Sequence, residues 1–488
     1  MNRTCVSYKV LVGLEIHVQL ATKSKMFTGA RNGFGGEPNS QVDEQVLGLP
    51  GVLPVINKRA VEYAMMVGLA LGCQIARHTK WDRKSYYYPD LPKNYQISQY
   101  DLPLCHSGRY LLETDEGVKT IRIRRAHLEE DAGKLLHEAP GGYPIDYSIV
   151  DLNRAGTPLL EIVTEPDFDS PRAVAAFAQE LQKLVQFLGV SEGQMQMGHM
   201  RFEPNINVHI TDQNGQVHKT AITEIKNLNS FSVLEKATAY EVQRQIRQWV
   251  ETGDLGRKST YGWDDARQMT VHQRDKEQAS DYRYFPDPDL VPVEVSDAWL
   301  AEVKAQVGEL PAARRKRYIK ALGLPAADAT ILTGDRSTGD FYEAALAAGG
   351  EPRRVANLIL AHGRRLANEK ARPVSELGIP PQRFAQVARL IDAGQITASN
   401  AGPLFDRLLE GDRDPLELAQ DMGLVLSSDT TAIDAAIDAM ISANPKPLQD
   451  YRGGKATALG ALTGMIMKQV KGANPQVVQQ RLREKLGS

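Results

Sequence analysis

Strict alternation of apolar and polar residues marks two long segments in the N-terminal half of the chain. In Tyr8–Leu20, one face is apolar, and the other carries Glu15 and His17. In Met200–Ile210, the polar face carries Glu203, and Pro204 indicates an edge position or a bulge at that point. Alternation over this length is typical of half-buried β-strands. The sequence therefore predicts two strands that each present acidic residues on a polar face.

Shorter signals complete the prediction for the first part of the chain. Leu159–Val163 and Ile222–Lys226 are expected to be strands. Pro171–Leu188 is expected to be a helix, because Ser170 is a favoured cap and proline is favoured at the first helical position. The first part is therefore predicted to be α+β, with a mostly antiparallel sheet.

The pattern changes near residue 293, where alanine, leucine and charged residues with helical spacing take over. Ala298–Val307 and Pro311–Leu322 are expected to be helices, with a loop near 333–340. A last helix begins at Pro475, with Asn474 as its cap. We predict a first domain over 1–293, a helical domain over 294–410 and a helical tail over 411–488.

Composition excludes several classes of protein. The 488 residues carry a net charge of −2, so contact with nucleic acid has to come from a local patch. The three cysteines, Cys5, Cys73 and Cys105, lie far apart and predict neither a disulfide framework nor a cysteine metal site. No apolar run reaches the ~18 residues of a membrane span. We therefore expect a cytoplasmic location.

Several acidic residues stand in positions that folding alone does not require. Glu161 interrupts the apolar run from Pro158 to Val163, where an unpaired carboxylate is costly. Glu15 and His17 share a strand face, and Glu129 and Glu130 belong to a run of three acids. Exposure to solvent explains the pair or the run equally well. A convergence of all these groups predicts a divalent-cation site, with Mg²⁺ preferred and Mn²⁺ as the alternative.

The chain contains no G-x-x-x-x-G-K-[ST] motif. Any nucleotide site therefore has to be built from the strand carboxylates and from basic residues. Tyrosines alternate with lysine and arginine between Trp81 and Gln96, a composition that suits stacking on bases and contact with phosphates. A proline-rich loop packed on a sheet has the same composition. The last 43 residues contain eight basic side chains against Asp450 and Glu484, which suits RNA phosphates or a solvated helix face.

Seven long motifs, in order along the chain, resemble the B subunit of the aspartyl/glutamyl-tRNA amidotransferases. They are Val12–Val18, Tyr88–Ser98, His127–Lys134, Val150–Arg154, Thr157–Glu161, Lys226–Phe231 and Asp281–Pro286. The segment Gly453–Ala456 in the tail fits the same family. The resemblance implies a catalytic cradle related to glutamine synthetase, then a helical domain and a small tail that binds tRNA.

The resemblance also assigns roles to residues. The magnesium and phosphoryl-transfer site falls on Glu15, His17, Glu129 or Glu130, and Glu161, and the expected mechanism uses Glu130 of the two. The residues expected to be catalytic are Glu15, His17, Glu130, Glu203, Lys84 and Lys93. Glu203 lies near the amide-forming centre, and Lys84 and Lys93 lie near the ammonia route. We expect substrate contacts from Arg83, Tyr87, Tyr88, Asn153, Arg154, Glu224, Lys226 and Asn227. We expect tRNA contacts from Arg452, Lys455, Lys468 and Lys471.

The family implies ATP as a substrate, an amidase A subunit, a small C subunit and aminoacylated tRNA(Gln) or tRNA(Asn) as partners. Many members carry a four-cysteine zinc knuckle, whose positions here hold Thr28, Ala30, Asp43 and Val46. We therefore predict no structural zinc. The expected reaction is ATP-dependent amidation of a misacylated glutamate or aspartate. The rival hypotheses are a non-catalytic tRNA-binding scaffold and a ligase that acts on free glutamate.

Overall fold

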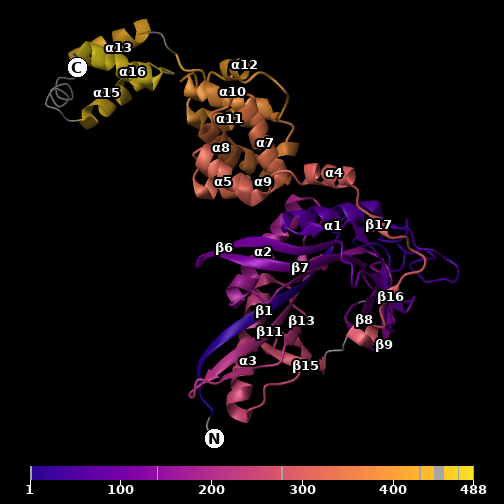
Figure 1. Cartoon of the computed structure of the whole chain (residues 1–488). Helices are drawn as coiled ribbons and strands as arrows, with labels where there is room; N and C mark the ends of the chain where they lie inside the picture. The colour runs from indigo at the N-terminus through magenta and orange to yellow at the C-terminus, as the bar shows by residue number, and fades with distance from the viewer. Residues whose placement is uncertain are drawn as a thin grey trace. The chain divides into compact units, whose positions relative to one another are not determined.

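The structure is a computed structural model that describes residues 3–139, 141–275, 279–427, 430–443, 456–470 and 472–486. The chain forms two compact units, Met1–Leu310 and Pro311–Ser488. The first contains the sheets and the second is helical (Figure 1). The prediction of an α+β part with a mostly antiparallel sheet, followed by a helical part, is confirmed.

The main sheet has ten strands, and every pairing except the one between β13 and β14 is antiparallel. In spatial order the strands are β15 (Met269–Asp275), β14 (Ser259–Asp264), β13 (Thr223–Lys226), β11 (Met200–Asp212), β1 (Cys5–Gln19), β10 (Pro158–Thr164), β7 (Gly117–Glu130), β6 (Cys105–Thr114) and β2 (Gln74–Ile75), with β12 (Val217–Lys219) beside β11. The four strands that carry the predicted acids are therefore neighbours.

The apolar face of this sheet forms the core of the first unit. Val12, Leu14 and Ile16 of β1 are almost completely buried there. Helices α1 (Lys58–Ala70), α2 (Pro171–Phe187) and α3 (Phe231–Thr252) contribute to the same core. Helix α2 begins as predicted, since Ser170 accepts a hydrogen bond from the third helical amide and proline occupies the first turn. Because successive residues alternate across a strand, Glu15 and His17 lie on the opposite face.

The structure contradicts a bulge at Pro204, but the proline does occupy a locally unpaired edge position. Strand β11 lies inside the sheet, and Pro204 faces Leu14 of β1 in unbroken register. Pairing on the other side of β11 covers Asn205 and Ile206 but not Pro204. The proline therefore stands where the ladder with β13 ends, and the interior strand keeps its register.

Three small sheets accompany the main one. The first joins β16 (Phe285–Pro286), β4 (Asp82–Ser85) and β5 (Tyr95–Ser98). The second pairs β17 (Val293–Glu294) with β3 (His78–Thr79), and the third pairs β8 (Lys134–Ala139) with β9 (Tyr143–Asp151). The first small sheet supplies side chains to the polar face of the main one, as the site geometry shows.

Helix α4 (Asp297–Val307) belongs to the first unit, because Val303 and Val307 are buried in its core. Arg336 already lies in a helix that Asp335 caps, so the expected loop near 333–340 is too long. The second unit contains α5 (Pro311–Ala321), α6 (Ala326–Leu332), α7 (Arg336–Ala347), α8 (Pro352–Leu358), α9 (Arg364–Lys370), α10 (Pro381–Asp392), α11 (Ala401–Leu408), α12 (Pro415–Asp421), α13 (Thr430–Ala443), α15 (Ala456–Gln469) and α16 (Pro475–Leu486). Among the described helices, none is long and apolar enough to cross a membrane.

The described residues of the second unit form two separate hydrophobic clusters. One runs from Tyr318 to Ala419, and the other joins α13, α15 and α16 between Ile433 and Leu482. The last helix begins as predicted, with Asn474 accepting a hydrogen bond from the amide of Gln476. The three-part division with boundaries at 293 and 410 stays a prediction.

Candidate active site

Strand register brings the predicted acids together on the polar face of the main sheet. His17 on β1 lies opposite Glu161 on β10 and opposite Arg201 on β11. Glu161 in turn lies opposite His127 on β7. Directly opposed residues of an antiparallel pair have Cβ atoms about 5 Å apart on the same face. Arg201, His17, Glu161 and His127 therefore form one row across four strands.

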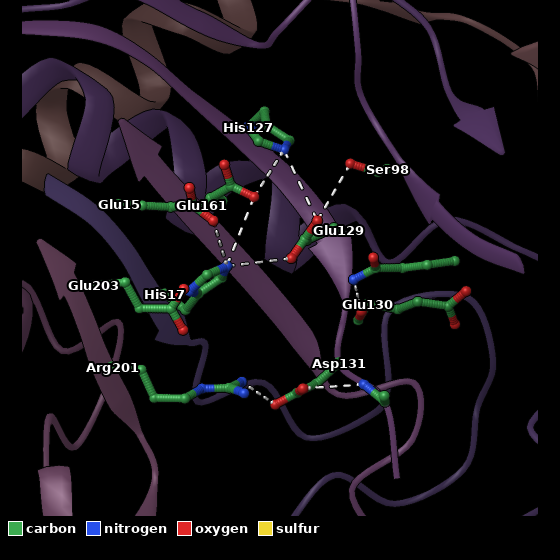
Figure 2. A network of polar contacts seen from close by, with 12 residues as sticks. Glu15, His17, Ser98, His127, Glu129, Glu130, Asp131, Glu161, Arg201 and Glu203 are labelled. Carbon is green, nitrogen blue, oxygen red and sulfur yellow. Dashed lines mark hydrogen bonds and ion pairs between the residues drawn. The ribbon is translucent and has the colours of Figure 1, made fainter. Parts of the chain in front are cut away.

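Glu129 and Glu15 extend this row into a cluster around the imidazole of His17 (Figure 2). The His17 Nε2 atom lies 3.6 Å from Glu161, 3.8 Å from Glu129 and 3.9 Å from Glu15. His127 Nε2 approaches the same Glu161 oxygen at 3.6 Å. We call Glu15, His17, His127, Glu129 and Glu161 the carboxylate–imidazole cluster.

The electrostatics of this cluster reflect acids crowded in a buried space. Burial and the charge of Glu161 raise the pKa of Glu15 and the pKa of Glu129 to about 7. Burial opposes ionisation of Glu161 as well, but the imidazoles of His127 and His17 lower its pKa below the ordinary value. Burial lowers the pKa of His127 to about 4. Burial opposes the charged form of His17, but Glu161, Glu203 and Glu129 together outweigh it and raise the pKa to about 9.

The donor set fits a divalent cation. Two triplets of the cluster, Glu15–His17–Glu161 and His127–Glu129–Glu161, have ligand atoms within 4.8 Å of one another. Carboxylate oxygens suit Mg²⁺, and the imidazoles suit Mn²⁺ as well. A bound cation would offset the mutual repulsion of these buried acids and would displace the proton from His17.

Glu130 does not join the cluster. It follows Glu129 on β7, so its side chain points to the other face of the strand. There its carboxylate forms an ion pair with Lys93 and accepts a hydrogen bond of 3.0 Å from the amide of Ile97. The expectation that Glu130 is the catalytic, metal-holding acid is therefore wrong, because Glu129 is the one that points into the cluster, where Ser98 donates to it at 3.3 Å.

The two predicted lysines have different surroundings. Burial opposes the charged form of Lys84, but Glu129 together with the other negative groups nearby, Glu161 among them, outweighs it and raises the pKa of this ammonium group. Lys84 also lies over the ring of Tyr282, with its nitrogen 4.9 Å from the centroid. Lys84 therefore borders the cluster, whereas Lys93 lies on the far side of β7 with Glu130.

A second group of acids adjoins the first along β11 and β13. Glu203 lies opposite Glu15, and ligand atoms of Glu15, Glu203 and Glu224 lie within 4.8 Å of one another. The Lys226 ammonium lies 2.5 Å from Glu203 and 3.8 Å from Glu224. Asn227 follows in the left-handed region with φ of 67° and ends the strand. Three of the predicted contact residues, Glu224, Lys226 and Asn227, therefore lie beside Glu203.

The other predicted contacts divide into two sets. Arg83 is bound to Asp287 at 2.7 Å and Asp289 at 2.8 Å. Tyr87 and Tyr88 are 70% and 56% exposed in the loop after β4. In contrast, Asn153 and Arg154 line a cleft of about 630 Å³ together with Gln19 of β1.

Only one of the predicted tRNA contacts has a described environment. Lys468 lies in the last turn of α15. Arg452, Lys455 and Lys471 lie outside the described residues. The structure therefore adds no geometry for these three positions.

At the four positions of the zinc knuckle, Thr28 donates a hydrogen bond to Asp43, whose carboxylate also accepts from the amide of Val46 at 2.9 Å. Ala30 and Val46 join a small apolar cluster with Leu152. These side chains present no four-sulfur site, and the absence of zinc stays a prediction.

Sequence reasoning did not select His127, Ser98, Asp131 or Arg201 as site residues. Asp131 accepts a hydrogen bond from Arg201 (Figure 2). It also accepts one from Gln19 at 2.9 Å. Arg201 shares the polar face with Glu203, and His127 shares its strand face with Glu129. The alternation could have identified these two, whereas Ser98 and Asp131 reach the site through tertiary contacts.

The first unit is a catalytic domain of the GatB/GatE type, because the family model with that description matches residues 10–301. A second model, the GatB domain, matches residues 340–486. The B subunit of the aspartyl/glutamyl-tRNA(Asn/Gln) amidotransferase of Carboxydothermus hydrogenoformans is 45% identical over 481 residues, which is 98% of this chain and 99% of that protein. The B subunit of the same enzyme in Moorella thermoacetica is 43% identical over 483 residues, which is 99% of this chain and 100% of that protein.

The chain therefore belongs to the family of B subunits of aspartyl/glutamyl-tRNA amidotransferases, which are glutamine-hydrolysing ligases. This confirms the resemblance drawn from the seven motifs. Membership of this family is less consistent with the two rival hypotheses, a non-catalytic tRNA-binding scaffold and a ligase that acts on free glutamate.

Proposed function

We propose that the chain catalyses ATP-dependent amidation of glutamate or aspartate that is esterified to tRNA(Gln) or tRNA(Asn). The observation that supports this most is the carboxylate–imidazole cluster on the polar face of a sheet that matches the catalytic domain of the family. We also propose that the sheet is a cradle of the glutamine synthetase type and that the protein works in the cytoplasm.

The chemistry follows from the poor reactivity of a carboxylate. Transfer of the γ-phosphoryl group of ATP to a carboxylate oxygen releases ADP and gives an acyl phosphate. Ammonia then attacks the acyl carbon, inorganic phosphate leaves, and the nitrogen loses a proton. The result is the amide, and both bond changes take place at the same carboxyl group.

Different residues are assigned to cation binding, to neutralising the phosphates and to proton transfer. Glu15, His17, Glu129 and Glu161 would hold a divalent cation, which offsets charge on the phosphoryl group when bound. The Lys84 ammonium beside Glu129 adds positive charge for the phosphates. Glu203 is the candidate to accept the proton of the attacking nitrogen, with Lys226 holding its carboxylate at 2.5 Å.

The partners follow from the same proposal. Free ammonia at the acyl phosphate requires a source, which we assign to an amidase A subunit that hydrolyses glutamine. A small C subunit would complete the heterotrimer. We assign the 411–488 tail to tRNA, on the basis of the eight basic side chains in its last 43 residues.

The test is amide formation on charged tRNA by the complex reconstituted with A and C subunits. ATP-dependent conversion that requires all three subunits is the expected result. Deleting the tail from residue 411 should abolish tRNA binding and leave ATP binding intact. ATP hydrolysis stimulated by free glutamate but not by charged tRNA would instead favour the ligase of free glutamate.

A further inference from the structure

Two positively charged side chains border the carboxylate–imidazole cluster, and the proposed function uses only one of them. Lys84 lies beside Glu129, on the side of β7. Arg201 lies on the side of β11, directly opposite His17 in the register of β1 and β11. The two side chains of such a pair leave the same face with Cβ atoms about 5 Å apart. The guanidinium of Arg201 is therefore a near neighbour of the cluster without belonging to it.

The guanidinium of Arg201 has hydrogen-bond donors to spare. One terminal nitrogen donates to Asp131 (Figure 2). The Nε atom is buried and makes no hydrogen bond within the described residues. The side chain as a whole is 34% exposed, so a ligand can reach it. A buried donor without an acceptor is costly unless a ligand or water supplies one, and the planar fork of arginine suits the oxygens of a phosphate or a carboxylate.

The carboxylate of Asp131 fixes the position of this guanidinium. Its Oδ2 atom accepts hydrogen bonds from Arg201 on β11 and from Gln19 on β1, the latter at 2.9 Å. Its Oδ1 atom accepts from the amide of Ala132 at 3.0 Å. Burial opposes the charged form of Asp131, but the guanidiniums of Arg201 and Arg154, together with the Gln19 hydrogen bond, outweigh it and lower the pKa. Asp131 is therefore ionised and held in one orientation.

The charges around Asp131 leave a positive balance. The Nε atom of Arg154 lies 3.7 Å from the oxygen that Arg201 binds. Arg154 is held there because this nitrogen also donates to the carbonyl of Ala132 at 2.9 Å. Two guanidiniums share one carboxylate, so the three side chains together carry one net positive charge. A positive group that is fixed before the reaction stabilises negative charge that develops during it.

We propose that Arg201 is a further catalytic residue, whose guanidinium holds the phosphoryl group on its way from ATP to the carboxylate, and that Asp131 is its positioning residue. The proposal rests on the proposed function. In that step the bond from the γ-phosphorus to the ADP oxygen breaks, and a bond to a carboxylate oxygen of the aminoacyl group forms. Arg201 gives and takes no proton. It offsets charge on the phosphoryl oxygens from the side of β11, as Lys84 does from the side of β7.

The first measurement is the binding of inorganic phosphate to the full complex saturated with ADP and Mg²⁺, by calorimetry. The complex contains the wild-type chain, Arg201→Ala, Arg201→Lys, Asp131→Asn or the matched control Arg244→Lys. Arg244 is also held by a carboxylate, that of Glu241 at 2.6 Å, but within helix α3 of the apolar core. We expect Arg201→Ala to weaken phosphate binding about 10- to 100-fold. Arg201→Lys and Asp131→Asn should weaken it less, and the control should bind as the wild type does.

The second measurement is steady-state amidation of charged tRNA, with and without guanidinium ion at a low, non-denaturing concentration. Arg201→Ala should lower kcat about 100- to 1000-fold and leave the KM for charged tRNA unchanged. Added guanidinium should restore part of the lost kcat, which it cannot do for a residue that only supports the fold. If Arg201→Ala does not assemble with its partners, Arg201→Lys is judged by the phosphate affinity and by the same division between kcat and KM.

Three results would overturn the proposal. The first is a phosphate affinity of the Arg201 variants equal to that of the wild type, and the second is no rescue by guanidinium. The third is a raised KM for charged tRNA with unchanged phosphate affinity, which would assign Arg201 to the acceptor carboxylate instead. A wild-type complex that forms no amide refutes the proposed function, and the phosphate titration then still decides whether Arg201 binds a phosphoryl group.

Discussion

Replacing Glu129 with glutamine should stabilise the protein without metal and weaken its response to metal. Burial and the charge of Glu161 raise the pKa of Glu129 from 4.5 to about 7. The folded protein therefore bears a cost of about 3 kcal/mol for the ionised carboxylate at pH values above about 7, and none below about 4.5. The glutamine variant lacks this cost, and it weakens one hydrogen bond of about 1 kcal/mol from Ser98.

The expected net gain near pH 8 is about 2 kcal/mol, or roughly 3 °C in the unfolding temperature of the first unit. A divalent cation should make the wild type more stable than Glu129→Gln. Wild-type protein gains about 2.7 kcal/mol when the cation stands at a hundredfold excess over its dissociation constant. Each tenfold loss of affinity in Glu129→Gln removes about 1.4 kcal/mol of that gain.

The assay is thermal unfolding at about pH 8 in EDTA and over a Mg²⁺ titration, for Glu129→Gln and for the matched variant Glu130→Gln. Glu130 forms a buried ion pair with Lys93 on the other face of β7. Its loss should destabilise the fold by about 3–5 kcal/mol and leave the Mg²⁺ response intact. Equal loss of the Mg²⁺ response in both variants, or a Glu129→Gln variant less stable than wild type in EDTA, would refute the reasoning.

Three further predictions concern residues around the site. Lys226→Met leaves the carboxylate of Glu203 without the ammonium 2.5 Å away, so urea unfolding should show a loss of about 1–3 kcal/mol, and an unchanged midpoint would contradict this. Burial lowers the pKa of Lys25 to about 8, so the unfolded chain binds more protons between about pH 8 and 10.5 and wild-type stability gains a positive pH slope there. Lys25→Met should lack that slope component, and parallel stability profiles for the two proteins would exclude it. Ser98→Ala removes the hydroxyl that orients Glu129 and should weaken Mg²⁺ binding up to about tenfold, measured by calorimetry, while an effect as large as that of Glu129→Gln would show that orientation is not its role.

The sequence by itself determined which residues share a face. Alternation along Tyr8–Leu20 placed Glu15 with His17, and alternation along Met200–Ile210 placed Glu203 with its strand partners. The sequence also singled out Glu161, because a carboxylate inside an apolar run needs a partner. These conclusions are local, because the two-residue period of a strand fixes the direction of each side chain before any packing occurs.

Only the tertiary structure decided which strands are neighbours and in what register. The row from Arg201 to His127 exists because β11, β1, β10 and β7 pair in that order. The choice between Glu129 and Glu130 depended on which face of β7 meets the polar side, and a shift of one residue would exchange them. The cleft lined by Gln19 and Arg154 joins segments far apart in the chain. Pairing and packing over such separations depend on the whole core, which no local pattern encodes.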